Sequence, residues 1–454
     1  MKIMNPATGE LLRELNEDSP ARIAEKHAAA RTAQAAWVAT PIEHRLECIR
    51  KFHDLIDAGK DVLARDLSLE AGKPLQESYN ELNGARTRIR FFLEQSLATL
   101  KTQKVRVDGA TEEEISFDPL GVVANISAWN YPWLVGVNVF VPALIGGNAV
   151  LYKPSEFATL TGLHIEALLH EAGIPKAVFT AIPGDYRSGE ALLELPLDGY
   201  FFTGSYKTGK HIATRVAEKL VPVGLELGGK DPLYVTDEVK DLKQVANAVA
   251  EGCFYNNGQS CCAVERVYVH ENVYGAFIAL FEQEVKALKP GNPLDRSFQQ
   301  GALTRPSHPG FLEAQIEDAL KKGAKLLTGG KRIEGKGAFF EPTVLLEVNH
   351  TMRVMTDETF GPVIGVMKVG NDEEAIKLMN DCEYGLTASV YSSNRARALR
   401  ILARTDTGTA YVNCCDRVSP YLPWAGRRHS GLGATLSTLG ILAFTKPRGW
   451  HIRG

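Results

Sequence analysis

The stretch GVVANISAWNYPWLVGVNVFVPALIGGNAVLYKPSE, residues 121–156, decides the fold, because it holds an apolar strand, a helix that starts after Pro132, and a second apolar strand. The same alternation continues through LHIEALLHEAG (163–173), AVFTAIPG (177–184) and GYFFTG (199–204). Apolar strands that alternate with helices are typical of a parallel sheet covered by helices on both faces. We therefore predict an α/β unit that binds its ligand at the carboxyl ends of these strands.

A second series of strands and helices begins near residue 230. Its strands are expected in PLYVT (232–236), ERVYVH (265–270), VIGVMKV (363–369) and TASVYSS (387–393), and its helices in LKQVANAVAEGCFY (242–255) and AFIALFEQEVKAL (276–288). Two such series predict an α/β protein with two doubly wound parallel-sheet domains. Their join near residues 226–232 places a cleft between them.

The first hundred residues have the pattern of long helices. Serine or threonine followed by proline, at 19–20 and 40–41, predicts two helix starts, and Pro74 opens a further helix. Beyond them, VRVDGATEEEISFDP (105–119) has two short extended runs around an Asp-Gly turn at 108–109, which predicts a β-hairpin. We expect this hairpin to project from the body of the protein.

The composition is that of an ordinary globular protein. The chain has 454 residues, 44% of them hydrophobic and 23% charged, and a formal net charge of -3. No basic excess favours nucleic acid or an anionic membrane surface as a partner. The N-terminal stretch MKIMNPATGELLREL lacks the apolar run of a secretory signal or a spanning helix, so a cytoplasmic protein is expected.

The cysteines raise a question of chemistry. There are seven, an odd number, and no two have the CxxC spacing of a zinc knuckle or a redox dithiol, so we expect reduced thiols and no metal site. The stretch NNGQSCC places Cys261 and Cys262 side by side ahead of a predicted strand. From the residues alone, either thiol is a nucleophile or both are small packing side chains.

The stretch FFTGSYKTGKH, residues 201–211, has a glycine turn between a predicted strand and a predicted helix. Gly204 and Lys210 fit the GxxxxGK pattern of a phosphate-binding loop, but His211 replaces the hydroxyl residue that binds Mg²⁺. The free N–H groups of a helix that starts near Ser205 still form an anion site for phosphate or pyrophosphate. The alternative is a tight turn without a ligand.

Several polar side chains stand where they can act on a ligand. Glu226, between leucines in LELGGK, is a base near neutral pH if it is buried, unless Lys230 pairs with it. Asn130, among the aromatic residues of AWNYPW, either donates to a developing oxyanion or caps the next helix. Lys153 and Glu156, just past a strand, either hold the ribose of a dinucleotide or form a solvated salt bridge.

The order of these motifs resembles that of the aldehyde dehydrogenase superfamily. The matching stretches are AWNYPW (128–133), KPSE (153–156), FTGSYKTG (202–209), LELGGK (225–230), YNNGQSCCA (255–263) and ETFGPV (358–363). The resemblance runs from NPATGE near the start to HSGLG and AFT near the end, which is essentially the whole chain. It implies NAD(P)-dependent oxidation of an aldehyde to the carboxylic acid.

The resemblance also implies roles for single residues. Cys261, the second residue after Gln259, is the implied nucleophile, Glu226 the general base, and Asn130 the side-chain half of an oxyanion hole completed by the Cys261 N–H. The implied cofactor residues are Lys153 and Glu156 at the adenosine ribose, Gly204 and Ser205 at the pyrophosphate, Glu358 and Phe360 at the nicotinamide, and Trp129. A thiol fits this chemistry, because hydride cannot leave a planar aldehyde carbon until a nucleophile has added to it.

The implied architecture has three parts. They are a Rossmann-like NAD(P)-binding domain over 1–102 and 120–228, a catalytic domain over 229–431, and a β oligomerisation element over 103–119 and 443–454, in a homodimer or homotetramer. NAD is the expected cofactor, because Glu156 repels a 2′-phosphate, and NADP is the alternative, because Lys153 can accept that phosphate.

The C-terminal loop departs from the family pattern. It reads PWAGRRHSGLGAT, where many relatives carry Pro-Phe-Gly-Gly and Gly-Arg-Glu. The expected wall of the substrate funnel is Trp424, Tyr131, Trp133 and Tyr255. That wall favours apolar or aromatic aldehydes, whereas Arg417 or Arg427 in the same place favours an acidic one such as succinate semialdehyde.

Other functions compete with hydrolytic oxidation. One is an acylating enzyme that releases the thioester to coenzyme A, which Glu226 disfavours. Another is a non-redox nucleotide-binding protein or cysteine hydrolase, which lacks a histidine in the motifs other than His211. A purely structural role is opposed by the presence of the cysteine, the glutamate and the asparagine together.

Overall fold

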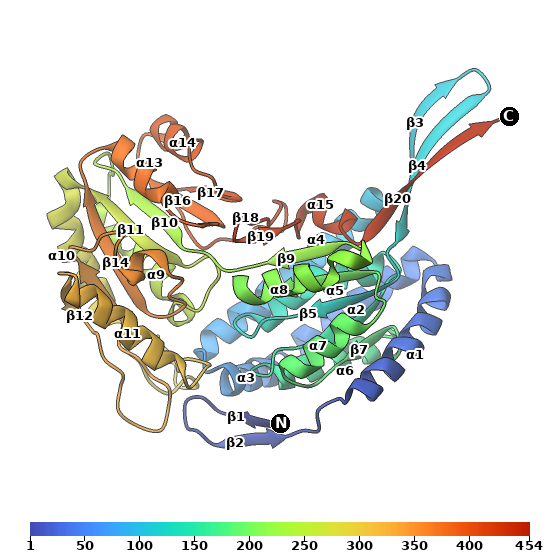
Figure 1. The fold of residues 1–454 in the computed structure, drawn as a ribbon, viewed down its shortest axis with the longest axis horizontal. Coiled ribbons are helices and arrows are strands. Elements are labelled where there is room, and N and C mark those ends of the chain that lie inside the picture. Colours follow the sequence, from blue (N-terminus) through green and yellow to red (C-terminus); the bar gives the residue numbers. More distant parts are fainter.

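The computed structural model describes residues 1–454 and contains two large sheets, each with helices around it (Figure 1). The first is six-stranded, in the order β19-β9-β8-β5-β6-β7. Its strands are β5 (Val122–Ile126), β6 (Ala149–Lys153), β7 (Phe179–Ala181), β8 (Gly199–Thr203), β9 (Val223–Glu226) and β19 (Gly431–Leu432). All pairs are parallel except β19 with β9, so a short strand from near the C-terminus closes this edge.

The second sheet is seven-stranded, in the order β12-β13-β14-β11-β10-β16-β17. Its strands are β10 (Asp231–Val235), β11 (Val264–His270), β12 (Lys325–Thr328), β13 (Thr343–Leu346), β14 (Val363–Val369), β16 (Thr387–Tyr391) and β17 (Thr409–Val412). Every residue of β5, β6, β10 and β16 is buried, as expected for parallel strands with helices on both faces. The predicted α/β fold with two parallel sheets is confirmed.

The helix starts predicted near Pro20, Pro74 and Pro132 are confirmed, whereas the helices expected from residues 163 and 276 begin four and five residues earlier. They are α1 (Pro20–Ala39), α2 (Ile42–Ala58), α3 (Lys60–Ala71), α4 (Leu75–Leu100), α5 (Pro132–Ile145), α6 (Thr159–Glu171), α7 (Tyr186–Glu194), α8 (Tyr206–Val216), α9 (Leu242–Phe254), α10 (Glu271–Ala287), α11 (His308–Lys321), α12 (Arg353–Thr356), α13 (Asp372–Asn380), α14 (Arg395–Leu402) and α15 (Ser437–Leu442). Ser19 caps α1 by accepting from the Arg22 N–H. The predicted Thr40 cap is wrong, because Thr40 ends α1 and Pro41 precedes α2 without a side-chain cap. No helix is both long and apolar enough to span a bilayer.

A three-stranded antiparallel sheet extends from the body of the molecule (Figure 1). Its central strand β4 (Thr111–Pro119) pairs with β3 (Gln103–Asp108) in the predicted hairpin and with the C-terminal strand β20 (Thr445–Arg453). Two small ribbons complete the fold, β1 (Lys2–Met4) with β2 (Leu11–Glu14), and β15 (Tyr384–Gly385) with β18 (Arg427–Arg428).

The order of the first sheet brings three predicted site residues together. Strands β5, β8 and β9 are parallel neighbours, so their carboxyl ends lie at one edge. The chain reaches Asn130 after β5 and Gly204 after β8, and Glu226 is the last residue of β9. Ligand sites form at this edge of open α/β sheets.

A buried ion pair holds α4 against the turn that carries Asn130. The side chains of Lys73 and Glu81, 1% and 0% exposed, form this pair. Lys73 Nζ also donates to the carbonyl oxygen of Asn130 at 2.6 Å, and Glu81 Oε1 accepts from the N–H of Trp133 at 2.9 Å. The pair thus fixes both sides of the turn.

Breaking this pair should destabilise the protein strongly. Lys73→Met leaves the Glu81 carboxylate buried without its cation, and we expect the free energy of unfolding to fall by about 3–5 kcal/mol. Lys73→Met with Glu81→Gln removes both charges but keeps an acceptor for Trp133, so it should recover part of the loss. Urea denaturation gives the free energy of unfolding of both variants. If Lys73→Met is as stable as the wild type, the expectation is wrong.

Candidate active site

The cysteine loop begins in the 3₁₀ turn η2 (Tyr255–Gly258). Asn256, Asn257 and Gly258 have φ values of 52°, 56° and 69°, which is left-handed backbone. A Cβ on Gly258 would lie 2.4 Å from the carbonyl oxygen of Gly361, so only glycine fits there. This bend turns the following cysteines toward the cleft.

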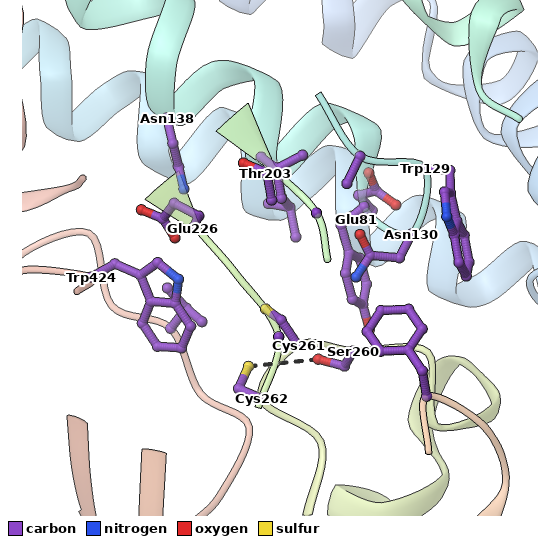
Figure 2. Close-up of a pocket in the computed structure, with 18 of the residues that line it drawn as sticks. Glu81, Trp129, Asn130, Asn138, Thr203, Glu226, Ser260, Cys261, Cys262 and Trp424 are labelled. Carbon is purple, nitrogen blue, oxygen red and sulfur yellow. Dashed lines mark hydrogen bonds between the residues drawn. The ribbon is translucent and has the colours of Figure 1, made fainter. Parts of the chain in front are cut away.

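The two thiols have different surroundings (Figure 2). Cys262 is buried, and its Sγ donates to Asp416 Oδ1 at 2.8 Å, where the Ser260 hydroxyl also donates at 3.1 Å. Hydrogen bonding with Cys261, burial and the charge of Asp416 raise the pKa of the Cys262 thiol well above its ordinary value. Cys261 is only half-buried and lines a large cavity between the two sheets' domains that Asn130 and Glu226 also line. Both cysteines line this cavity, but Cys261 is the less buried of the two, so its thiol is the more accessible nucleophile.

Asn130 and the main chain of Cys261 present N–H groups near this thiol. The Asn130 amide is buried and donates to the carbonyl oxygen of Gln259 at 3.2 Å, which fixes its orientation and uses one of its two N–H groups. The Cys261 N–H donates no hydrogen bond in the structure. The capping alternative for Asn130 is wrong, because Tyr131 occupies the N-cap of α5 without a side-chain bond.

Glu226 is the base candidate on the other side of the cavity (Figure 2). Thr435 Oγ1 donates to its Oε1. Burial raises the pKa of Glu226 to about 7, although the Thr435 hydrogen bond and the charge of Arg88 lower it. The alternative pairing with Lys230 is wrong, because Lys230 Nζ contacts Glu265 Oε2 at 2.7 Å.

The cavity joins most of the predicted site residues. Its volume is about 750 Å³. The predicted residues in its wall are Asn130, Glu226 and Cys261 with Trp129, Gly204, Ser205, Glu358 and Phe360. Lys153 and Glu156 are not part of this wall and lie farther along the same sheet edge, at the end of β6.

The Glu358 end of the cavity suits a flat ring. Phe360 and Trp129 pack edge to face with ring centroids 5.4 Å apart. Glu358 Oε1 accepts from the N–H of Gly229 at 3.1 Å, and a Cβ on Gly228 would lie 2.0 Å from the same oxygen. The glycine pair of LELGGK therefore lets this carboxylate approach the backbone closely.

The residues predicted to hold a dinucleotide have free polar groups. Lys153 is buried, its Nζ donates only to the carbonyl oxygen of Pro154 at 3.0 Å, and burial lowers its pKa. No ion pair joins it to Glu156, so the salt-bridge alternative is wrong.

The N-terminus of α8 also has free donors. Ser205 caps α8, and the N–H groups of Tyr206 and Lys207 make no hydrogen bond. A free ammonium and a free helix N-terminus on one sheet edge fit the hydroxyl and phosphate groups of a dinucleotide.

The predicted funnel wall is partly wrong. Trp424, Tyr131 and Tyr255 line the cavity, but Trp133 does not, because its side chain is 1% exposed and stacks on Phe52 in the core. The residues that sequence reasoning missed are Arg88, Asp416 and Thr435, which also line the cavity.

The two candidate arginines separate in the structure. Arg427 pairs with Asp406 at 3.3 Å and lies outside the cavity wall. Arg417 does line the cavity, but its guanidinium contacts Glu251 at 3.0 Å and is 62% exposed. Neither arginine is therefore a buried cation that lacks a partner, which is what a site for an acidic substrate group would need.

A half-buried thiol, a carboxylate with a raised pKa and free N–H groups at the edge of a parallel sheet define a thiol-dependent α/β enzyme. The family model described as "Aldehyde dehydrogenase family" matches residues 1–449. The chain belongs to the aldehyde dehydrogenase family, and it is an NAD(P)-dependent aldehyde oxidoreductase.

Relatives with known names agree with this assignment. A succinate-semialdehyde dehydrogenase [NADP(+)] of Deinococcus radiodurans is 35% identical over 98% of this chain and 93% of its own length. A betaine aldehyde dehydrogenase of Rhizobium leguminosarum is 34% identical over 94% of this chain and 88% of its own.

Solved structures have the same fold. The crystal structure of an E. coli NADP dependent enzyme has a TM-score of 0.97 at 30% identity and covers 100% of this chain and 94% of its own. A betaine aldehyde dehydrogenase of Staphylococcus aureus in complex with NAD+ has a TM-score of 0.95 at 30% identity, with 100% and 92% covered.

The two neighbouring thiols should differ in reactivity. We expect one equivalent of iodoacetamide at pH 8 to label Cys261 well before Cys262, because Cys262 is buried and held in its protonated form. Tandem mass spectrometry locates the label, and Cys262→Ser should keep the fast labelling that Cys261→Ser loses. Equal labelling of both thiols in the wild type contradicts this assignment.

Proposed function

We propose that Cys261 is the nucleophile and Glu226 the general base of the aldehyde oxidation. The observation that carries this proposal is one cavity lined by a half-buried thiol, a carboxylate whose pKa is about 7, and the amide of Asn130. The two reacting groups share no hydrogen bond, which suits a base that acts on a water molecule between them.

The first half of the cycle forms a covalent bond to the protein. The Cys261 sulfur adds to the aldehyde carbon, its proton passes to solvent, and the carbonyl oxygen becomes an oxyanion. The second Asn130 N–H and the free Cys261 N–H can donate to this oxyanion. When bound, the nicotinamide cofactor supplies the hydride acceptor, and loss of hydride from the tetrahedral carbon leaves a thioester on Cys261.

The second half of the cycle releases the acid. Glu226 takes a proton from water, and the water oxygen attacks the thioester carbon. The carbon–sulfur bond then breaks, the carboxylic acid leaves, and the Cys261 thiolate is restored. Burial raises the pKa of Glu226, and hydrogen bonds from Thr435 and Trp424 limit this rise, so the carboxylate can act as a base near neutral pH.

We assign the remaining residues by their position. Gly204 and Ser205 lie at the turn that suits a pyrophosphate, and Lys153 with Glu156 lies where the adenosine ribose is expected. Trp129, Glu358 and Phe360 form the part of the cavity wall that suits the nicotinamide side. The carboxylate of Glu156 favours NAD over NADP.

We further propose a cytoplasmic homo-oligomer with the predicted domain roles. In this division, 1–102 with 120–228 binds the cofactor, 229–431 carries the nucleophile, and 103–119 with 443–454 forms the contact between subunits. The apolar side chains of Val105, Val107, Trp450 and Ile452 on this sheet are 55%, 60%, 44% and 43% exposed. Exposed apolar residues on unpaired edge strands are typical of an interface.

Glu226→Gln should separate acylation from hydrolysis. We expect a burst of NAD(P)H close to one per active site, followed by turnover that is about 100-fold or more slower. In the wild type, the rate of thioester hydrolysis should rise as the pH passes through about 7, because Glu226 is protonated and inactive as a base below its raised pKa. Stopped-flow measurements across pH test both points, and unchanged steady-state turnover would exclude Glu226 as the base.

The interface should depend on the hairpin. The double variant Val105→Lys with Val107→Lys places charges on exposed positions, so it should leave the fold intact but shift the protein toward monomer. Leu220→Lys is the matched control, because Leu220 is 93% exposed and lies elsewhere. Light scattering after gel filtration gives the masses, and equal masses for the double variant and the wild type contradict the proposed interface.

A further inference from the structure

Helix α4 contributes one face to the active-site cavity. The residues it places there are Asn80, Glu81, Gly84, Thr87 and Arg88. Their spacing of one, three or four positions puts them on one side of a helix. A polar face on a helix that packs against α5 is unusual for a core element, so it indicates contact with a ligand or with water.

Arg88 is a buried cation on this face. It is 8% exposed, and its Nη1 donates to the carbonyl oxygen of Leu134 at 2.9 Å and to Asn138 Oδ1 at 3.0 Å. Its Nε and Nη2 make no hydrogen bond, and no carboxylate lies within ion-pair distance. Both contacts come from α5, so they hold the guanidinium in one place and leave one edge of it free.

Neither of the carboxylates near Arg88 forms an ion pair with it. Glu81 contacts Lys73 and the Trp133 N–H, and Thr435 donates to Glu226. A buried charge without a counter-ion is costly, and proteins keep such charges where a ligand supplies the missing partner.

Arg88 also lies close to the reacting groups. Burial lowers the pKa of its guanidinium, and the groups that raise it most are Cys262, Glu226 and Cys261. Asn138, which anchors Arg88, points into the same cavity as Glu226 (Figure 2). Arg88, Glu226 and Cys261 line this one cavity, so a substrate bound to Cys261 shares the cavity with Arg88.

We propose that Arg88 binds a carboxylate at the far end of the aldehyde substrate and selects aldehydes that carry this acid group. The free guanidinium edge matches the two oxygens of a carboxylate. The inference rests on the proposed aldehyde oxidation, and it assigns the selection to α4 rather than to Arg417 or Arg427. The probe is succinate semialdehyde, a four-carbon aldehyde that carries a carboxylate at its far end. Butanal has the same number of carbons but no carboxylate, so it is the neutral control.

The test compares these two aldehydes in four proteins. We expect Arg88→Gln to lower kcat/KM for succinate semialdehyde by about 100-fold, mainly through KM, and to change kcat/KM for butanal by less than about threefold. Arg88→Lys should recover part of the loss, because it restores the charge but not the forked geometry. Arg86→Gln is the matched control, because Arg86 lies on the same helix but pairs with Asp57 and is absent from the cavity wall.

A binding measurement adds a readout independent of turnover. Glutarate cannot react with Cys261, and it should slow the alkylation of Cys261 by iodoacetamide in the wild type and in Arg86→Gln but not in Arg88→Gln. Protection in all three proteins would overturn the proposal, and so would protection in none of them.

The remaining outcomes separate the proposal from the function on which it rests. Equal losses with both aldehydes would overturn the proposal, because Arg88 would then act on Cys261 or Glu226 rather than on the substrate. Wild-type protein that oxidises butanal as well as succinate semialdehyde would also overturn it, while the aldehyde oxidation would stand. If the wild type prefers glyceraldehyde 3-phosphate to succinate semialdehyde, Arg88 binds a phosphate rather than a carboxylate, and the assignment is overturned. If no aldehyde yields NAD(P)H, both the role of Arg88 and the proposed roles of Cys261 and Glu226 are rejected.

Discussion

The hydrogen bond from the Asn130 amide to the Gln259 carbonyl joins the two α/β units at the proposed active site. Asn130 follows a strand of the first sheet, and Gln259 precedes the cysteines at the edge of the second. Lys73 holds the other side of the Asn130 turn through its carbonyl oxygen, and Asn256 donates to both carbonyl oxygens. The proposed oxyanion donors and the Cys261 thiol are thus positioned by one shared network, and a shift of either unit would separate them.

The parts of the site that the sequence predicts are those that are local in the chain. The strand and helix alternation gives two parallel sheets, and the carboxyl ends of β5, β8 and β9 follow from that pattern. The glycines of LELGGK and the left-handed turn before Cys261 are also local, because each depends on a few neighbouring residues. Short motifs could therefore place Glu226 and Cys261 before any tertiary contact was known.

The parts that the sequence does not predict depend on contacts between distant residues. Thr435 reaches Glu226 across 209 residues and Asp416 reaches Cys262 across 154, and no local pattern marks either contact. The first contact requires the two-residue strand β19 to pair with β9, which is too short a signal to find in a sequence. Trp133 was misplaced for a different reason. The residues of α5 that line the cavity are Leu134, Val135, Asn138 and Val139, and with about 100° between successive helical residues Trp133 lies on the other side of the helix, against the core.

The buried charges around the cavity differ in how far the protein compensates them. The charges of Lys73 and Glu81 compensate each other, and this ion pair holds the Asn130 turn in place. Glu226 has a hydroxyl but no cation in ion-pair contact, so its pKa stays near the pH at which a base can both take and give a proton. Arg88 has only carbonyl acceptors. Because an uncompensated charge costs stability, its retention at Glu226 and Arg88 supports the roles proposed for these two residues, whereas the compensated Lys73–Glu81 pair belongs to the scaffold.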